Sequence, residues 1–152
     1  MAPHLDETDR AILAELLQDG RISIRALAEQ IHISRANAYT RINRLVSDEV
    51  IAGFTAQLNP KNAGLSTSAY VTVTIEQNSW RTVAEALRTI PYIEHIALVG
   101  GDFDVLVLVR TPDNSALRHV VLERVQEIAG VLATRTWLVF EEHAGRSVDW
   151  AQ

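Results

Sequence analysis

Two acidic residues, Asp102 and Asp104, follow a glycine pair and precede an apolar run in the stretch VGGDFDVLVLV, Val99 to Val109. Carboxylates in this setting could be turn residues, metal ligands, an acid/base pair or counter-ions for a cationic small molecule. Asp104 begins the apolar run, where an ionised carboxylate needs a compensating partner, and an ammonium group would supply one. The neighbouring glycines leave backbone N–H groups open to a carboxylate. An α-amino acid carries both charges and therefore fits this stretch.

Other chemistries for these acids find less support in the sequence. A hairpin turn in which Asp102 bonds to its own backbone stays open. His95 and His119 have no compact ligand spacing with the acids, which argues against a metal site, and the chain has no cysteine for a thiolate site. Catalysis by paired carboxylates needs a cleft and an activated water, which no motif indicates. We therefore predict a protein without metal or cofactor that is not an enzyme.

A second group with chemical potential is basic, because five arginines lie between residues 21 and 44 against one acid, Glu29. On a helical wheel, the predicted helix of residues 34–47 has one apolar stripe and one polar stripe. Arginine and asparagine on such a polar stripe can bind guanine and adenine edges in the major groove, while arginines near a helix start can contact phosphates. A solvated surface helix is the alternative. The predicted DNA contacts are Arg21, Arg25, Ser34, Arg35, Asn37, Thr40, Arg41 and Arg44.

Length and composition limit the class of protein. The chain has 152 residues, of which 47% are apolar and 22% charged, as in ordinary globular proteins. No apolar run approaches the roughly 20 residues that span a bilayer, and the acidic, polar N-terminus does not resemble a signal peptide. We therefore expect a cytoplasmic protein with no membrane partner. The net charge of -5 argues against a uniformly basic nucleic-acid binder, so DNA contacts would have to be local.

The elements that must position these groups fall into two domains. Residues 1–58 read as a helix-turn-helix domain, winged-helix-like, with helices begun by Asp6 or Thr8, by Ser23 and by Ser34. Alternating apolar residues then predict a strand over residues 51–58. A linker of residues 59–66 follows, rich in turn-forming residues.

Residues 67–152 alternate strands with helices. Strands are expected over 70–75, 93–99, 103–110 and 132–142, and helices over 79–89 and 115–129. This β-α-β-β-α-β order is ferredoxin-like, so the whole chain is α+β. The runs Val105–Val109 and Trp137–Phe140 are apolar almost throughout, which is typical of strands buried on both faces. Because two helices cover one face only, the other face should pack on a second copy, or alternatively on the N-terminal domain.

Taken in order, the motifs of the chain resemble those of the leucine-responsive and asparagine-responsive (Lrp/AsnC) transcription regulators over about 140 residues. The resemblance implies a bacterial or archaeal regulator that binds double-stranded DNA through its first domain, and dimerises and senses amino acids through its second. The matching residues are Asp9-Arg10-x-Ile12-Leu13, Asp19-Gly20-Arg21, Leu27-Ala28, Ser34 with Arg41-Ile42-x-Arg44-Leu45, Ile51-x-Gly53-Phe54, Leu58-Asn59-Pro60, Leu98-Val99-x-Gly101-Asp102-Phe103-Asp104 and Thr134-Arg135-Thr136.

The resemblance also implies where the amino acid and the partner chains bind. The effector of the family lies between neighbouring dimers, held by the loop that corresponds to residues 100–104, and the homodimers are expected to assemble into a tetramer of dimers, an octamer. Strand residues around the loop would line the site. The predicted effector contacts are Leu98, Gly100, Gly101, Asp102, Asp104, Thr134, Thr136 and Trp137.

Two departures from the family pattern bear on these expectations. His32 stands where the family usually has a glycine in a left-handed turn position, which histidine can adopt at some energetic cost. Trp137 stands where a smaller or different aromatic residue is common, which would change which effector fits. The predicted function is a sequence-specific transcription regulator modulated by a small amino acid. The alternatives are an architectural DNA-wrapping protein and an amino-acid-binding module that regulates an enzyme by contact.

Overall fold

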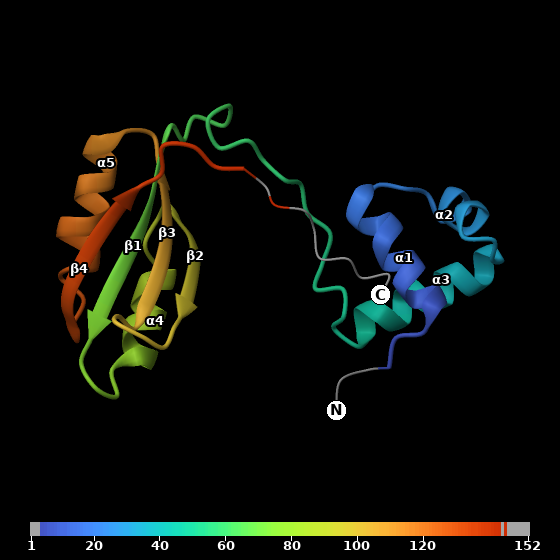
Figure 1. Cartoon of the computed structure of the whole chain (residues 1–152), viewed down its shortest axis with the longest axis horizontal. Helices are drawn as coiled ribbons and strands as arrows, with labels where there is room; N and C mark the ends of the chain where they lie inside the picture. Colours follow the sequence, from blue (N-terminus) through green and yellow to red (C-terminus); the bar gives the residue numbers. More distant parts are fainter. Residues whose placement is uncertain (1–3, 144, 146–152) are drawn as a thin grey trace. The chain divides into compact units, whose positions relative to one another are not determined.

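The computed structural model describes residues 4–143 and 145, and these form two compact units (Figure 1). The first unit extends to Gln57 and the second is Leu58–His143. The end of the predicted second domain, residues 144 and 146–152, lies outside the described residues. No helix in the described part of the chain is long and apolar enough to cross a membrane.

Three helices build the first unit, and each begins at a residue whose side chain accepts a backbone hydrogen bond. Ser23 and Ser34 accept N–H groups at 3.1 Å, as predicted. Of the two predicted caps of the first helix, Asp6 and Thr8, the structure has Asp6. Its side chain accepts the Asp9 N–H at 2.8 Å, and the Asp9 side chain accepts the Asp6 N–H at 3.2 Å. The helices are α1 (Glu7–Gln18), α2 (Ile24–Gln30) and α3 (Arg35–Ser47).

The turn between α2 and α3 has the conformation expected of a helix-turn-helix. His32 has a positive φ of 56°, so histidine does occupy the left-handed position predicted for it. Behind the turn, Ile12 of α1, Leu27 of α2, and Ala38 and Leu45 of α3 are buried in one core. This core holds α3 with its opposite side facing solvent.

The predicted strand over residues 51–58 is wrong, since residues 52–58 have no regular structure. No strand occurs among the described residues of the first unit, so the winged-helix expectation is confirmed for the helices only. Alternating apolar residues are compatible with a strand, but a strand forms only where a neighbouring backbone exchanges hydrogen bonds with it. Phe54 and Leu58 are 56% and 72% exposed, respectively.

The second unit is a four-stranded antiparallel sheet with the order β2-β3-β1-β4. The predicted β-α-β-β-α-β order and ferredoxin-like fold are confirmed. The second predicted helix differs in detail, because α5 is followed by a π-helical segment of residues Val120–Val125. The elements are β1 (Thr67–Ile75), α4 (Trp80–Arg88), β2 (Ile93–Leu98), β3 (Val105–Thr111), α5 (Asn114–His119) and β4 (Val131–Leu138).

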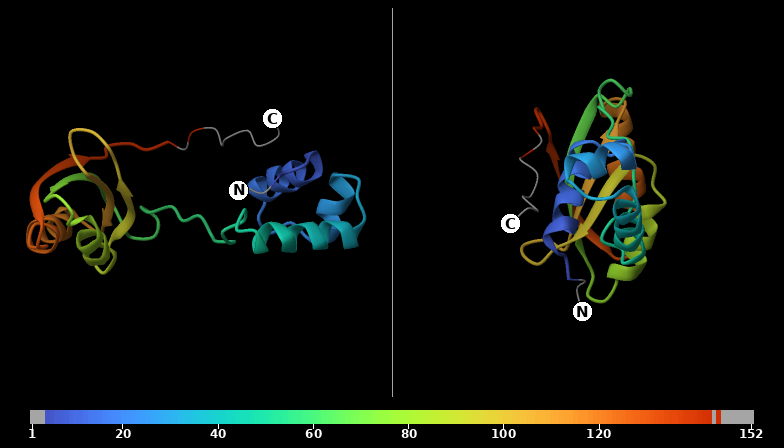
Figure 2. Two further views of the ribbon diagram at one scale, coloured as in Figure 1. Left: turned by 90° about the horizontal axis from the view of Figure 1, so that it is seen from below. Right: turned by 90° about the vertical axis from the view of Figure 1, so that its right-hand side faces the viewer.

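Both helices lie on one face of the sheet, and the other face carries no helix of the same unit (Figure 2). Valines that alternate along β1 and β3 point at the helices and are fully buried, among them Val71, Val73, Val107 and Val109. The opposite face, which we call the open face, carries Arg110 at 8% exposure. The Arg110 guanidinium donates to Glu94 at 2.5 Å and to Glu142 at 2.9 Å, which neutralises its charge.

Candidate functional site

The outward side of α3 is the surface that a helix-turn-helix presents to DNA. Tyr39 on this side is 60% exposed, and Thr40 and Asn43 are exposed beside it. Tyr39 and Asn43 were not among the predicted contacts, because the predicted polar stripe was centred on the arginines. A wheel centred directly opposite Ala38 and Leu45 would have found them.

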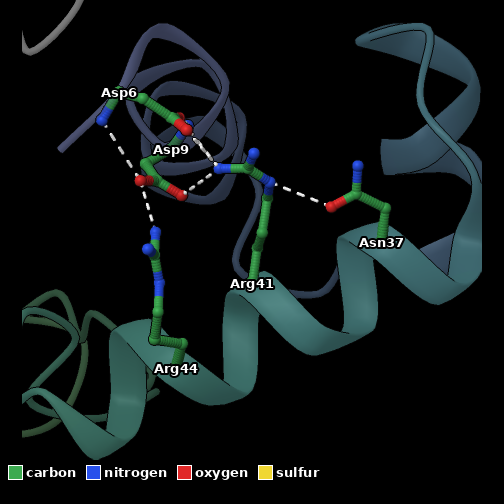
Figure 3. Close-up of polar contacts among 5 residues, drawn as sticks. All are labelled: Asp6, Asp9, Asn37, Arg41 and Arg44. Atoms are coloured by element: carbon green, nitrogen blue, oxygen red, sulfur yellow. Dashed lines mark hydrogen bonds and ion pairs between the residues drawn. The ribbon is translucent and has the colours of Figure 1, made fainter.

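The polar stripe predicted on α3 is divided by the structure. Arg41 turns toward α1, where its Nη1 donates to Asp6 at 2.7 Å and to Asp9 at 2.8 Å, and its Nε donates to Asn37 at 2.9 Å (Figure 3). Arg44 also donates to Asp9. The arginine side chains are 24% and 47% exposed, respectively. That these two arginines contact DNA stays a prediction, and both also form part of the first unit's internal ion-pair network.

Asp9 is the centre of this network and has no exposed surface. A carboxylate out of water is tolerated only when charges and donors compensate it, and here both of its oxygens accept from arginines of α3. The sequence contains a sign of this role. Asp9 lies three residues before Ile12 and seven before Leu16, so it falls on the apolar stripe of α1, where a charged residue needs a buried partner.

Charge and hydrogen bonding shift the ionisation of the network. The pKa of Asp6 falls from 3.8 to about 2, first because the Asp9 backbone N–H donates to it and then because the Arg41 guanidinium does so. Hydrogen bonds to Asp6 and then Asp9 raise the pKa of Arg41. Asp6 and Arg41 are therefore both charged near neutral pH.

Four other predicted DNA contacts are exposed to solvent. They are Arg21, Arg25, Ser34 and Arg35. Arg25 pairs with Glu29 at 2.9 Å, but both side chains are more than 60% exposed, so exchanging this partner for a phosphate would cost little. Ser34 uses its hydroxyl to cap α3. Its contact with DNA stays a prediction, as do those of the three arginines.

A cavity of about 690 Å³ opens on the second unit beside β1, β3 and β4. Three of the predicted effector contacts line it, namely Asp102, Thr134 and Trp137. Arg135 lines it as well, which sequence reasoning missed. The cavity thus has an anionic and a cationic side chain in one lining, with an indole beside them.

Asp104 has an internal partner that the sequence did not reveal. Its Oδ2 accepts the Ile75 backbone N–H at 2.9 Å, and its own N–H donates to the Val73 carbonyl at 3.1 Å. These bonds join the end of β1 to the loop before β3. The compensating partner required at the start of the apolar run is therefore available within the chain, and a contact with an effector stays a prediction.

Leu98, Gly100, Gly101 and Thr136 do not line this cavity, and the hydroxyl of Thr134, which does, has an internal partner. Leu98, Gly100 and Gly101 precede Asp102, and all three are exposed. Thr136 lines a different hollow, of about 360 Å³, between α5 and β4. The Thr134 hydroxyl accepts from Gln126 at 2.7 Å.

A further hollow lies in the first unit. Its volume is about 270 Å³, and it is lined only by apolar residues and glycine, including Leu13, Leu16 and Val50, so it suits no zwitterion. Across residues 4–143 and 145, no three His, Asp or Glu side chains form a group that could hold a metal ion.

Comparison with known proteins identifies the family. A family model described as the Lrp/AsnC ligand binding domain matches residues 68–148, more than half of the chain. The chain belongs to the Lrp/AsnC family of transcriptional regulators. A model described as winged helix-turn-helix DNA-binding matches residues 5–52, the region that holds α1 to α3. The resemblance inferred from the motifs is confirmed.

Individual relatives match along nearly the whole chain. The leucine-responsive regulatory protein of Escherichia coli K12 is 37% identical over 141 residues, which cover 91% of this chain and 86% of that protein. A helix-turn-helix type transcriptional regulator of Pyrococcus furiosus is 35% identical over 143 residues, with coverage of 92% and 95%.

Solved structures of the family agree with the fold. A transcriptional regulator of Neisseria meningitidis, solved in complex with L-Met, aligns with a TM-score of 0.88 at 25% identity, covering 95% of each chain. The AsnC protein of E. coli aligns with a TM-score of 0.88 over 97% of this chain and 99% of its own. At 20% identity, this second likeness concerns the fold alone.

Proposed function

We propose that this Lrp/AsnC regulator binds specific DNA sites through α3 and that a small amino acid in the Asp102 cavity modulates the binding or the assembly. The observation that carries the proposal is the cavity lining. Asp102 can pair with an α-ammonium group and Arg135 with an α-carboxylate, so the two ends of an amino acid have partners of opposite charge. The volume of about 690 Å³ lies within the range of small-molecule sites.

The amino-acid class gains support from a structural relative. The Neisseria regulator of the same fold was solved with L-Met. Trp137 lines the cavity of this chain and would contact an apolar or aromatic side chain of the effector. The indole is 59% exposed, so a bound ligand would change its surroundings.

The DNA contact is proposed for the exposed side of α3 and the arginines near the start of α2 and α3. Asn43 has the amide that pairs with adenine, and Tyr39 and Thr40 add hydroxyl groups. Arg21, Arg25 and Arg35 would contact phosphates and fix the register of the helix on the duplex.

Assembly is proposed through apolar surface that a single chain leaves in water. Phe140 is 90% exposed and Trp137 is 59% exposed, in addition to Phe54 and Leu58. Large exposed apolar side chains in such number favour a partner of the same kind. We propose a homodimer that uses the open face of the sheet and associates further into an octamer. Because Thr72 and Leu106 of the Asp102 cavity lie on the same face, such a dimer would enclose the cavity.

Calorimetric titration of the full chain with each of the twenty amino acids tests the effector proposal. We expect one amino acid, or a few related ones, to bind and to change the tryptophan fluorescence of the chain, and we expect the Arg135→Gln variant to lose most of this affinity. Gel shifts with a duplex selected by the protein from a random-sequence pool test the DNA proposal. Failure of every amino acid to bind would contradict the first half, and failure to select any sequence would contradict the second.

A further inference from the structure

The Nη1 and Nε groups of Arg41 donate their hydrogen bonds inside the protein. Its Nη1 lies 2.7 to 2.9 Å from three carboxylate oxygens of Asp6 and Asp9, and its Nε donates to the Asn37 amide oxygen (Figure 3). A two-bond fork to guanine needs two outward N–H groups from one guanidinium. Arg41 could form such a fork only by giving up bonds that it now makes.

Giving up those bonds would remove one of the two arginine partners of Asp9 and leave its Oδ1 without the guanidinium that now donates to it. Asp9 has no exposed surface, so water cannot replace the arginine. A buried carboxylate that loses its ion-pair partner is strongly destabilising, unlike an exposed pair such as Arg25 and Glu29, which can exchange partners freely. Burial therefore distinguishes Arg41 from the other arginines near the predicted DNA surface.

The bonds of Arg41 also join two helices. Asp6 and Asp9 belong to the first turn of α1 and its cap, whereas Arg41 lies in the middle of α3. Arg44, one turn further along α3, donates to the same Asp9. Two attachment points on one carboxylate fix both the rotation of α3 about its axis and its tilt against α1.

We propose that Arg41 is a positioning residue for DNA binding, which orients α3 through Asp9 and does not contact DNA. The inference rests on the proposed function, because α3 must be the helix that meets DNA. The exposed residues Tyr39, Thr40 and Asn43 are then presented to the bases by a helix whose rotation Arg41 sets. Arg44, with half of its side chain exposed, is not included in the inference.

An alternative hypothesis is that Asp6 and Asp9 mask Arg41 in the free protein and that DNA displaces the two carboxylates from it. Under masking, removal of a carboxylate releases the arginine and tightens DNA binding. Under positioning, the same removal loosens α3 and weakens specific binding, so the two accounts differ in the sign of one measured effect.

The test measures DNA binding of the full chain at several KCl concentrations, with the selected duplex and a scrambled one. We expect Arg41→Gln to weaken binding to the selected duplex at least tenfold, while the slope of log K against log salt and the affinity for the scrambled duplex stay unchanged. Arg35→Gln, at an exposed position in the first turn of α3, is the matched variant. If it loses a phosphate contact, its slope falls by about 0.9.

Carboxylate variants decide between positioning and masking. We expect Asp9→Asn to weaken specific binding severalfold. Asp6→Asn is the milder change, since asparagine still caps a helix, and it should weaken specific binding at least twofold. If Asp9→Asn does not fold, as its circular dichroism would reveal, Asp6→Asn alone carries the decision. Equal or tighter binding by Asp6→Asn would overturn the inference.

The outcomes also separate this inference from the proposed function. A loss of about one unit of salt slope in Arg41→Gln would overturn the positioning role while leaving the DNA-binding function in place. Wild-type protein that selected no duplex would overturn both.

Discussion

Gly130 lies against Ser79, so closely that a Cβ added at Gly130 would be 2.8 Å from the Ser79 Cβ. Ser79 precedes α4 and Gly130 precedes β4, so this contact joins the connections that lead into two separate elements. The Gly130 carbonyl also accepts the Glu76 N–H at 2.8 Å, and the glycine has a φ of +96°. Only glycine satisfies both the space and the backbone conformation at this point.

Gly130→Ala should therefore destabilise the second unit by about 2 to 4 kcal/mol, as the sum of backbone strain and overpacking. Gly64→Ala is a graded control, because Gly64 has a φ of +88° but open space around it, so about 1 kcal/mol is expected. Gly100→Ala, which meets nothing within 4 Å, should change stability by under about 0.5 kcal/mol. Urea unfolding of the three variants measures the order. Equal effects of Gly130→Ala and Gly64→Ala would show that the Ser79 contact is unimportant.

Acid should weaken the cap of α1 and its pairing with Arg41. The pKa of Asp6 is about 2 in the folded chain against an ordinary 3.8, so the charged form is favoured by folding. The resulting stability is fully present above about pH 4 and is lost as the pH falls toward 2. Asp6→Asn keeps the capping oxygen without the charge. Thermal unfolding should separate wild type from this variant at pH 7 and bring them together near pH 2, and a gap that does not depend on pH would contradict the assignment.

Asp102→Asn should mainly change the affinity for the effector, whereas Asp104→Asn should mainly change stability. Asp102→Asn removes the exposed carboxylate of the cavity and should weaken effector binding by about 1 to 2 kcal/mol. Asp104→Asn keeps an oxygen that can accept the Ile75 N–H, and its main effect should be a small loss of stability. Calorimetry on both variants, with unfolding measured in parallel, tells them apart. A larger loss of affinity in Asp104→Asn would return the effector contact to that residue.

Phe140 offers a test of assembly that leaves the single chain almost untouched. Because the side chain is 90% exposed, Phe140→Asp should not lower the stability of the fold itself. If the residue contacts another copy, sedimentation at micromolar concentration should reveal smaller assemblies than wild type. Glu141→Gln changes a neighbouring exposed side chain and serves as the control. Unchanged assembly in Phe140→Asp would exclude Phe140 from the interface.

The parts of the fold that depend on neighbouring residues were predictable from the sequence. Ser23 and Ser34 cap their helices through bonds to residues three positions away, and apolar spacing placed β1 and α4 within a few residues. The strand predicted over residues 51–58 failed because pairing depends on a partner that periodicity cannot reveal.

The site was harder to predict, because its decisive contacts are distant in sequence. Asp9 and Arg41 are 32 positions apart, and Asp104 and Ile75 are 29 positions apart. A helical wheel assigns Arg41 to a polar face but does not reveal that a carboxylate of another helix meets it there. Likewise, Arg135 entered the cavity lining through the pairing of β4 with β1, in which it lies opposite Thr72.

The attachment of Asp6 and Asp9 to α3 also determines how the first unit opens. The first turn of a helix ordinarily frays by itself, and its amide hydrogens exchange quickly with solvent. Here the first turn of α1 cannot fray without breaking its ion pairs with the middle of α3, so the two segments should open together. Hydrogen exchange of the amides of Arg10 and of α3 should then proceed at similar, slow rates, and the regulator would lose its DNA-facing helix all at once instead of turn by turn.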